Sequence, residues 1–239
     1  MNNCNRLNAS ILGISLFLGL ATLGYLLGNA AITFKEYERS VTVKGLAERE
    51  YPADIVIWPI QFTATSNDLG SLYESIEGST TRIREFLTTR GLDPAEISLS
   101  TPAITDKSAQ SYGNAAAPEF RYSAMQTVTV YSRNIVAVRT LMGELAQLGK
   151  QGIAFTGGNY QSQTEYIFTR LNEIKPAMIE EATTKAREVA LKFSEDSQSR
   201  LGKIKKASQG QFSISARDNN TPYIKRVRVV STVEYYLSD

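Results

Sequence analysis

The chain has 239 residues, with 26 Lys and Arg against 24 Asp and Glu, one Cys and no His. This length allows a substantial buried core. The near-neutral balance argues against a disordered chain and against a dedicated nucleic-acid binder. The absence of His excludes histidine metal sites and Ser–His or Cys–His nucleophiles, and a single Cys excludes an internal disulfide. We therefore expect no metal, no cofactor and no nucleic-acid partner.

The N-terminal part of the chain has the composition of a membrane helix. No charged residue lies between Arg6 and Lys35, and a helix needs roughly 20 apolar residues to cross a bilayer. We predict a short cytoplasmic leader at 1–8, a transmembrane signal-anchor at 9–32 that holds the protein in the lipid bilayer, and one extracytoplasmic domain at 33–239.

Two further points concern this apolar segment. A signal peptide removed after Ala30 is the alternative to a retained anchor, because small residues precede that position. Gly24 and Gly28 have the small-xxx-small spacing that lets two membrane helices approach closely, so they are candidate helix-dimer contacts.

The exported part predicts seven strands and three helices. Period-two alternation marks the strands and apolar residues at helical spacing mark the helices. Pro59 cannot donate a ladder hydrogen bond, so the second strand is expected to be an edge or to bulge there. The strands are predicted at 41–47, 54–66, 97–105, 120–132, 153–168, 204–216 and 226–237, and the helices at 69–87, 135–148 and 171–201.

The predicted order is β-β-α-β-β-α-β-α-β-β. Strand pairs with helices inserted between them fit an α+β fold, in which an antiparallel or mixed sheet is covered by three helices. The polar segment 107–119 has no periodicity and is expected to be an exposed loop. The large side chains expected in the core include Trp58, Phe62, Tyr122, Phe155 and Phe193.

Several short segments, in this order and spacing, resemble the SIMPL-domain family of bacterial envelope proteins. They are Ser40-Val41-Thr42-Val43-Lys44-Gly45-Leu46-Ala47, Pro52-Ala53-Asp54, Leu87-Thr88-Thr89-Arg90-Gly91-Leu92, Gln126-Thr127-Val128-Thr129-Val130 and the Ala-rich stretch Glu180 to Ala190. The chain departs from the family in lacking a second glycine in a Gly-x-Gly pattern after Gly45.

The resemblance implies an exported domain that self-associates, of a kind linked to oxidative-stress defence or surface antigenicity. It implies no catalytic residues. We therefore expect a non-enzymatic scaffold in envelope maintenance or stress response. It would be a homo-oligomer, single-pass in the bacterial inner membrane, with its C-terminal domain in the periplasm.

The charged residues leave two alternatives open. Paired carboxylates at Glu48 and Glu50, or at Glu180 and Glu181, would be needed by a His-free hydrolase. Basic residues near the C-terminus form a candidate patch for an anionic ligand, an envelope polyanion or an acidic envelope protein. These residues are Lys203, Lys205, Lys206, Lys225, Arg226 and Arg228.

Overall fold

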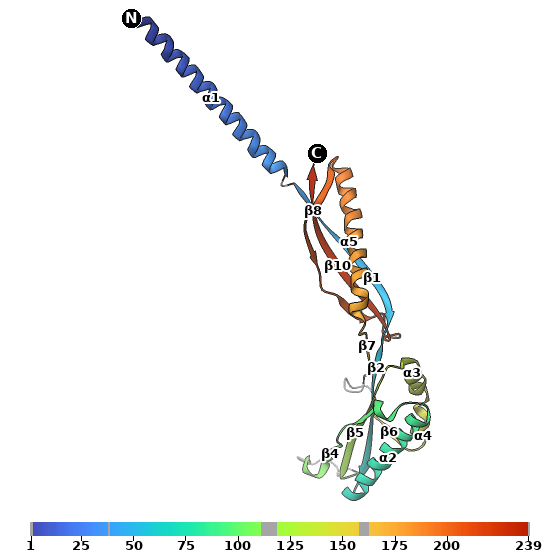
Figure 1. Ribbon diagram of the computed structural model, residues 1–239. Coiled ribbons are helices and arrows are strands. Elements are labelled where there is room, and N and C mark those ends of the chain that lie inside the picture. Colours follow the sequence, from blue (N-terminus) through green and yellow to red (C-terminus); the bar gives the residue numbers. More distant parts are fainter. Residues whose placement is uncertain (1, 38, 111–118, 158–162, 239) are drawn as a thin grey trace. The chain divides into compact units, whose positions relative to one another are not determined.

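The computed structural model describes residues 2–37, 39–110, 119–157 and 163–238 (Figure 1). The loop predicted at 107–119 lies mostly outside these residues, apart from a 3₁₀ turn at Lys107–Gln110. The other elements are α1 (Asn2–Tyr37), β1 (Ser40–Pro52), β2 (Ile55–Ser66), α2 (Leu69–Thr89), a 3₁₀ turn at Pro94–Glu96, β3 (Ile97–Leu99), β4 (Ala103–Asp106), β5 (Tyr122–Ser132), α3 (Ile135–Glu144), α4 (Ala146–Lys150), β6 (Ala154–Phe155), β7 (Glu165–Ile167), α5 (Leu171–Asp196), β8 (Arg200–Gln209), β9 (Ser213–Ala216) and β10 (Ile224–Ser238).

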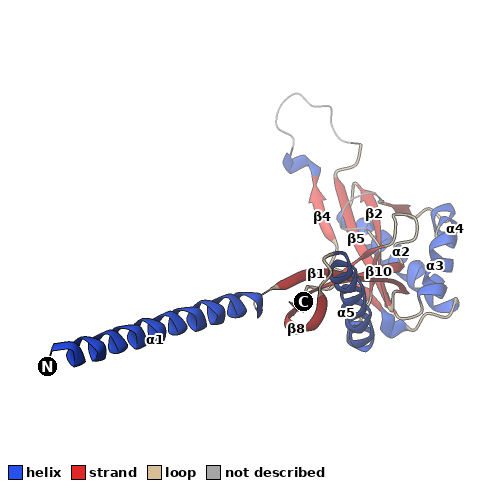
Figure 2. Cartoon of the chain, turned by 90° about the horizontal axis from the view of Figure 1, so that it is seen from above, coloured by secondary structure: helices blue, strands red, loops and turns tan. Residues whose placement is uncertain are grey.

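The fold is α+β with antiparallel strand pairs, as predicted (Figure 2). Beyond α1, the described residues form four α-helices instead of three, because the helix predicted at 135–148 divides at Leu145. The Leu145 amide donates to Met142 O, and the Leu148 amide donates to Leu145 O. These three-residue hydrogen bonds tighten the backbone and end the α-helical ladder of α3.

Three of the predicted strands are each divided into two shorter ones. The range 97–105 contains β3 and β4, 153–168 contains β6 and β7, and 204–216 contains β8 and β9. Pro102, which has no amide hydrogen, lies between β3 and β4. The helix predicted at 171–201 ends earlier, at Asp196, and the rest of that range begins β8.

The six-stranded sheet is built around β2. Strand β5 pairs with β2 without interruption from Val56 to Ser66, so the prediction that β2 is an edge strand, or bulges at Pro59, is wrong. On the other side of β2, β7 pairs with residues 55–57 and β6 with residues 62–63. Among the described residues, no strand pairs with 58–61 on that side, so the chain tolerates Pro59 where the second neighbour is interrupted.

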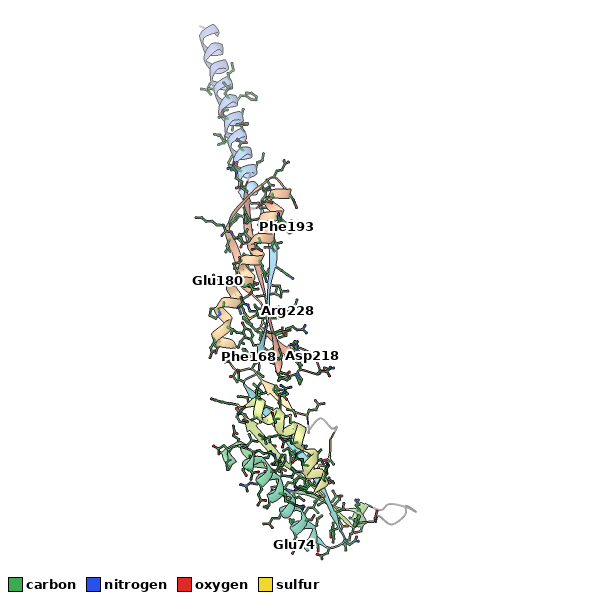
Figure 3. All side chains as sticks on the ribbon, turned by 90° about the vertical axis from the view of Figure 1, so that its right-hand side faces the viewer. Glu74, Phe168, Glu180, Phe193, Asp218 and Arg228 are labelled. Atoms are coloured by element: carbon green, nitrogen blue, oxygen red, sulfur yellow. The ribbon has the colours of Figure 1, made fainter. Side chains whose placement is uncertain are left out.

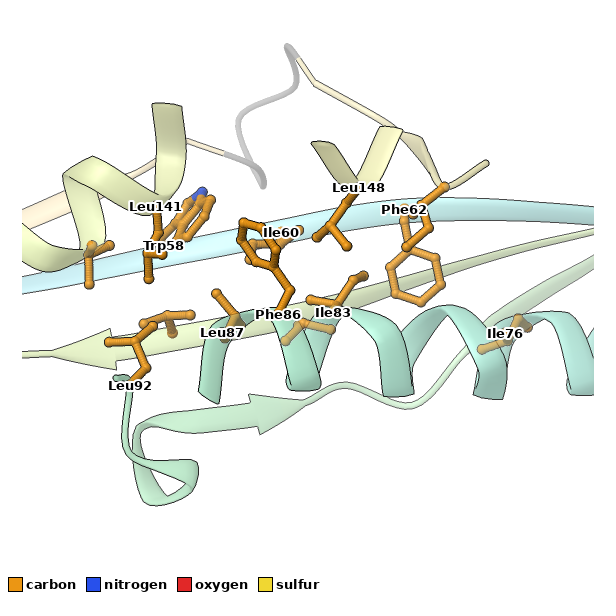
Figure 4. Packing of buried hydrophobic residues seen from close by; sticks show 14 of the residues in the cluster. Trp58, Ile60, Phe62, Ile76, Ile83, Phe86, Leu87, Leu92, Leu141 and Leu148 are labelled. Atoms are coloured by element: carbon orange, nitrogen blue, oxygen red, sulfur yellow. The ribbon is translucent and has the colours of Figure 1, made fainter. Parts of the chain in front are cut away.

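The larger core lies between this sheet and its helices. Trp58, Ile60 and Phe62 of β2 are buried, as predicted from their alternation. Figure 4 shows that they point toward apolar side chains of α2, α3 and α4. Asp68 begins α2, because its carboxylate accepts a hydrogen bond from the Ser71 amide at 2.8 Å.

The chain divides into two compact units. The first contains Met1–Glu48, Lys175–Ser213 and Arg228–Asp239; the second contains Arg49–Ile174 and Ile214–Val227. The range predicted to be one domain therefore holds two units. The chain passes between them inside β1, α5, β9 and β10.

In the first unit, α5 packs on β1 and β10, and β10 lies between β1 and β8. The buried face of α5 consists of Met178, Ala182, Ala186, Ala190 and Ser194. The predicted stripe through Val189 and Phe193 is wrong, because these side chains are 40% and 55% exposed. Small residues at four-residue steps let the helix lie close to the strands, and this close approach leaves no room for Phe193 beneath it.

Candidate binding surfaces

The structure separates the six basic residues of the candidate anionic patch. Lys203, Lys205 and Lys206 lie in β8 and Arg228 lies in β10, all in the first unit. The other two, Lys225 and Arg226, belong to the second unit. Adjacent strands do not bring even the first four together, because Lys206 pairs with Glu234, six residues beyond Arg228. That separation corresponds to about 20 Å along β10.

Carboxylates neutralise part of this charge. Lys205 Nζ lies 3.1 Å from Glu234 Oε1, and Arg228 Nε lies 4.0 Å from Glu48 Oε2. The Ser40 hydroxyl donates to Glu234 at 2.6 Å, and together with Lys205 it holds the pKa of Glu234 below its usual value. In the second unit, burial lowers the pKa of Lys225.

Lys203 differs from its neighbours in β8, because it lines a cavity between α5 and β8. The volume of this cavity is about 450 Å³. Its walls are Thr183, Thr184 and Arg187 of α5, Gly202, Lys203 and Ile204 of β8, and Tyr235 of β10. Among the described residues, neither Arg187 nor Lys203 forms an ion pair, so the cavity presents two positive charges.

The sequence analysis did not identify the helical side of this cavity. Thr183 and Arg187 are four residues apart and therefore lie on one face of α5, directly beside the buried alanine stripe. The available signal was this pair of polar residues at helical spacing. It was not interpreted because the stripe itself was continued through Val189 and Phe193.

The second unit has a larger cavity, of about 540 Å³, between α2 and the segment 94–102. The Thr80 hydroxyl donates to Gln126 Oε1 at 2.9 Å, and Gln126 Nε2 donates to Ser100 O at 2.8 Å. Both side chains that line the cavity at this point already bond to protein groups. Glu77, Arg84 and Glu85 also line it, so its charge is mixed.

The carboxylates required by a hydrolase lie in different environments. Glu50 pairs with Arg217 at 3.4 Å, and Glu181 pairs with Lys185 at 2.6 Å, while Glu48 is the partner of Arg228. Glu180 is exposed on α5, as Figure 3 shows. Within the described ranges, no group of three or more His, Cys, Asp or Glu side chains could hold a metal ion.

The candidate dimer contacts lie in α1. Among the described residues, Leu12–Thr33 is the one helical segment long and apolar enough to cross a membrane. Its position near the N-terminus fits either an anchor or a signal sequence. A Cβ atom added at Gly24 or Gly28 would meet no atom within 4 Å, so both glycines present an open surface.

Comparison with known proteins identifies the class of this exported-type α+β fold. Residues 41–234 match the SIMPL family, which is described as "protein of unknown function (DUF541)". The chain belongs to this family. No curated protein matches its sequence.

Proposed function

We propose that this protein is a non-catalytic module that is anchored in the bacterial inner membrane and self-associates in the periplasm. The apolar helix Leu12–Thr33 supports the anchor. Membership of the SIMPL family supports an envelope location, and with it a scaffold role in envelope maintenance or oxidative-stress response. The ion pairs of Glu48, Glu50 and Glu181 support a function in binding rather than in hydrolysis.

The observation that carries self-association is the open edge of β8. This strand has ten residues, of which nine are exposed, and it pairs with β10 on one side. Among the described residues no strand covers its other side. A long uncovered edge presents unpaired N–H and C=O groups, which readily pair with a strand of another chain.

An exposed apolar surface on α5 adds to this edge. Val189, Leu191 and Phe193 are 40%, 42% and 55% exposed, and Phe193 is visible at the surface in Figure 3. A second copy of the chain would bury such side chains, and each buried aliphatic or aromatic side chain contributes about 1.5–3 kcal/mol.

Light scattering on residues 35–239 and on the detergent-extracted full chain tests the proposal. We expect a defined oligomer of both. Gly210 N donates to Val230 O, so the alternation of an antiparallel pair directs the Ala207 amide toward the free edge. Ala207→Pro removes that donor without breaking a β10 hydrogen bond, and should dissociate the oligomer.

The matched control is Ala207→Val, which changes the same side chain but keeps the amide hydrogen and should remain oligomeric. Monomers of both constructs at all concentrations would contradict self-association. An oligomer that forms only in the full chain would place assembly in α1 instead of β8.

A further inference from the structure

We propose that the cavity between α5 and β8 binds the phosphate group of an anionic lipid headgroup. This inference rests on the anchoring part of the proposed function, and it concerns a different surface from the β8 edge.

The charges that line the cavity favour an anion. Arg187 and Lys203 contribute two cations, and the lining includes no carboxylate. The nearest acidic residue of α5 on this side, Glu180, precedes Arg187 by seven residues, or about 10 Å along the helix axis. It is therefore too far along the axis to form an ion pair with the guanidinium.

The uncharged groups of the cavity complete a site for an ester of phosphate. The hydroxyls of Thr183 and Thr184 are hydrogen-bond donors on the helical wall. Ile204 provides apolar surface on the opposite wall, and its side chain is 49% exposed. A guanidinium, an ammonium and hydroxyl donors match the oxygens of a phosphate, and the exposed isoleucine matches the glycerol and upper acyl carbons of a lipid.

The chain connections place this cavity close to a bilayer that holds α1. The helix α1 continues to Tyr37, which is about 6 Å of rise beyond Thr33. Arg39 follows two residues later, at most about 7 Å further. Its carbonyl accepts a hydrogen bond from Leu237 N at 2.9 Å, and the cavity residue Tyr235 lies two positions from Leu237 in β10.

These short steps favour a lipid over a soluble phosphate compound. A headgroup at the membrane surface is present at high local concentration, and Lys or Arg residues near that surface gain favourable interaction with anionic lipid. The same step count holds wherever α1 points, because it depends on the length of the chain alone.

Native mass spectrometry of the full chain in an uncharged detergent tests the site. The probes are dihexanoyl phosphatidylglycerol, dihexanoyl phosphatidylcholine and inorganic phosphate at equal concentrations. We expect retention of phosphatidylglycerol above the other two. The double variant Arg187→Gln/Lys203→Gln should bind it about thirtyfold more weakly, because each basic residue near a lipid phosphate contributes roughly fivefold.

The matched control is Lys175→Gln/Arg133→Gln, which removes the same net charge from two exposed residues outside the cavity. It should retain phosphatidylglycerol like the parent. Equal loss in both double variants, or equal retention of phosphatidylcholine, would overturn the site. Equal retention of inorganic phosphate would overturn the lipid assignment.

The same spectra separate this site from the anchor. A mature chain that lacks the first 30 or so residues would refute the anchor on which the inference rests. An intact chain that retains no phosphatidylglycerol would refute the lipid site and leave the anchor standing.

Discussion

Gly45 of β1 lies directly against the backbone of α5 at Ala182. A Cβ atom added at Gly45 would be 1.8 Å from Ala182 O and 2.5 Å from Ala186 N. Both contacts are with backbone atoms, which no side-chain rotation can relieve. The glycine and the alanine stripe together bring helix and strand into close contact in the first unit.

Gly45→Ala should therefore destabilise the first unit by about 3 kcal/mol, at the upper end of the usual cost of overpacking. Thermal or urea unfolding followed by circular dichroism measures this change. Gly78→Ala in α2 is the control, because its Cβ would meet only the end of Arg82 at 4.0 Å. That substitution should stabilise the protein by about 0.5–1 kcal/mol through helix propensity. Similar effects of the two substitutions would contradict the contact at Ala182.

A buried hydroxyl in β10 gives a second prediction. Ser231 is 3% exposed, and its Oγ has no hydrogen-bond partner among the described residues. Ser231→Ala removes an unsatisfied polar group, and should leave stability unchanged or raise it by about 1 kcal/mol. Ser132→Ala is the contrasting variant, because the Ser132 hydroxyl accepts from Asn134 N at 3.0 Å. We expect it to lose about 1 kcal/mol, and chemical denaturation would show whether the two variants differ in sign.

The acid dependence of the second unit should include a contribution from Asp106. Hydrogen bonds from Arg121 and Ser108 lower the pKa of this carboxyl to about 2, from an ordinary value of 3.8. Because the pKa is lower in the folded state, the contribution to stability is present above pH 4 and is lost as the pH falls toward 2.

Thermal midpoints of the parent and of Asp106→Asn, measured from pH 5 to 2, check this expectation. The variant should begin with a lower midpoint at pH 5 and lose less of it on acidification. Asp196→Asn, which removes an exposed carboxylate of α5 that forms no ion pair among the described residues, should follow the parent. Parallel curves for the parent and Asp106→Asn would show that the Arg121 contact contributes nothing to acid stability.

The last prediction concerns association of the apolar helix. Gly24→Leu/Gly28→Leu should lower the dimer fraction of the full chain in detergent, because leucine side chains prevent two backbones from approaching. Gly13→Leu/Gly19→Leu adds the same bulk at glycines that lack the four-residue spacing, and should leave the dimer unchanged. A crosslinking yield that is equal in the two double variants would rule out the Gly24–Gly28 face as the contact.

The sequence determined the local features of this protein. Alternation in β2 and β5 correctly assigned the buried faces that hold Trp58, Phe62 and Val128, because a residue's side of a strand depends only on its position. The same reasoning found the cap of α2 and the membrane-length helix. It also found the family, through short segments whose order and spacing are carried by the chain itself.

The tertiary structure decided which strands are neighbours and which surfaces stay uncovered. Pro59 indicated an edge, yet β2 is central, because β6 and β7 pair on either side of the proline. Lys203 was grouped with five other basic residues by sequence proximity, but its closest functional companion in space is Arg187 of α5. Periodicity specifies the face on which a residue lies. The partner across that face is set by long-range packing, which local sequence does not record.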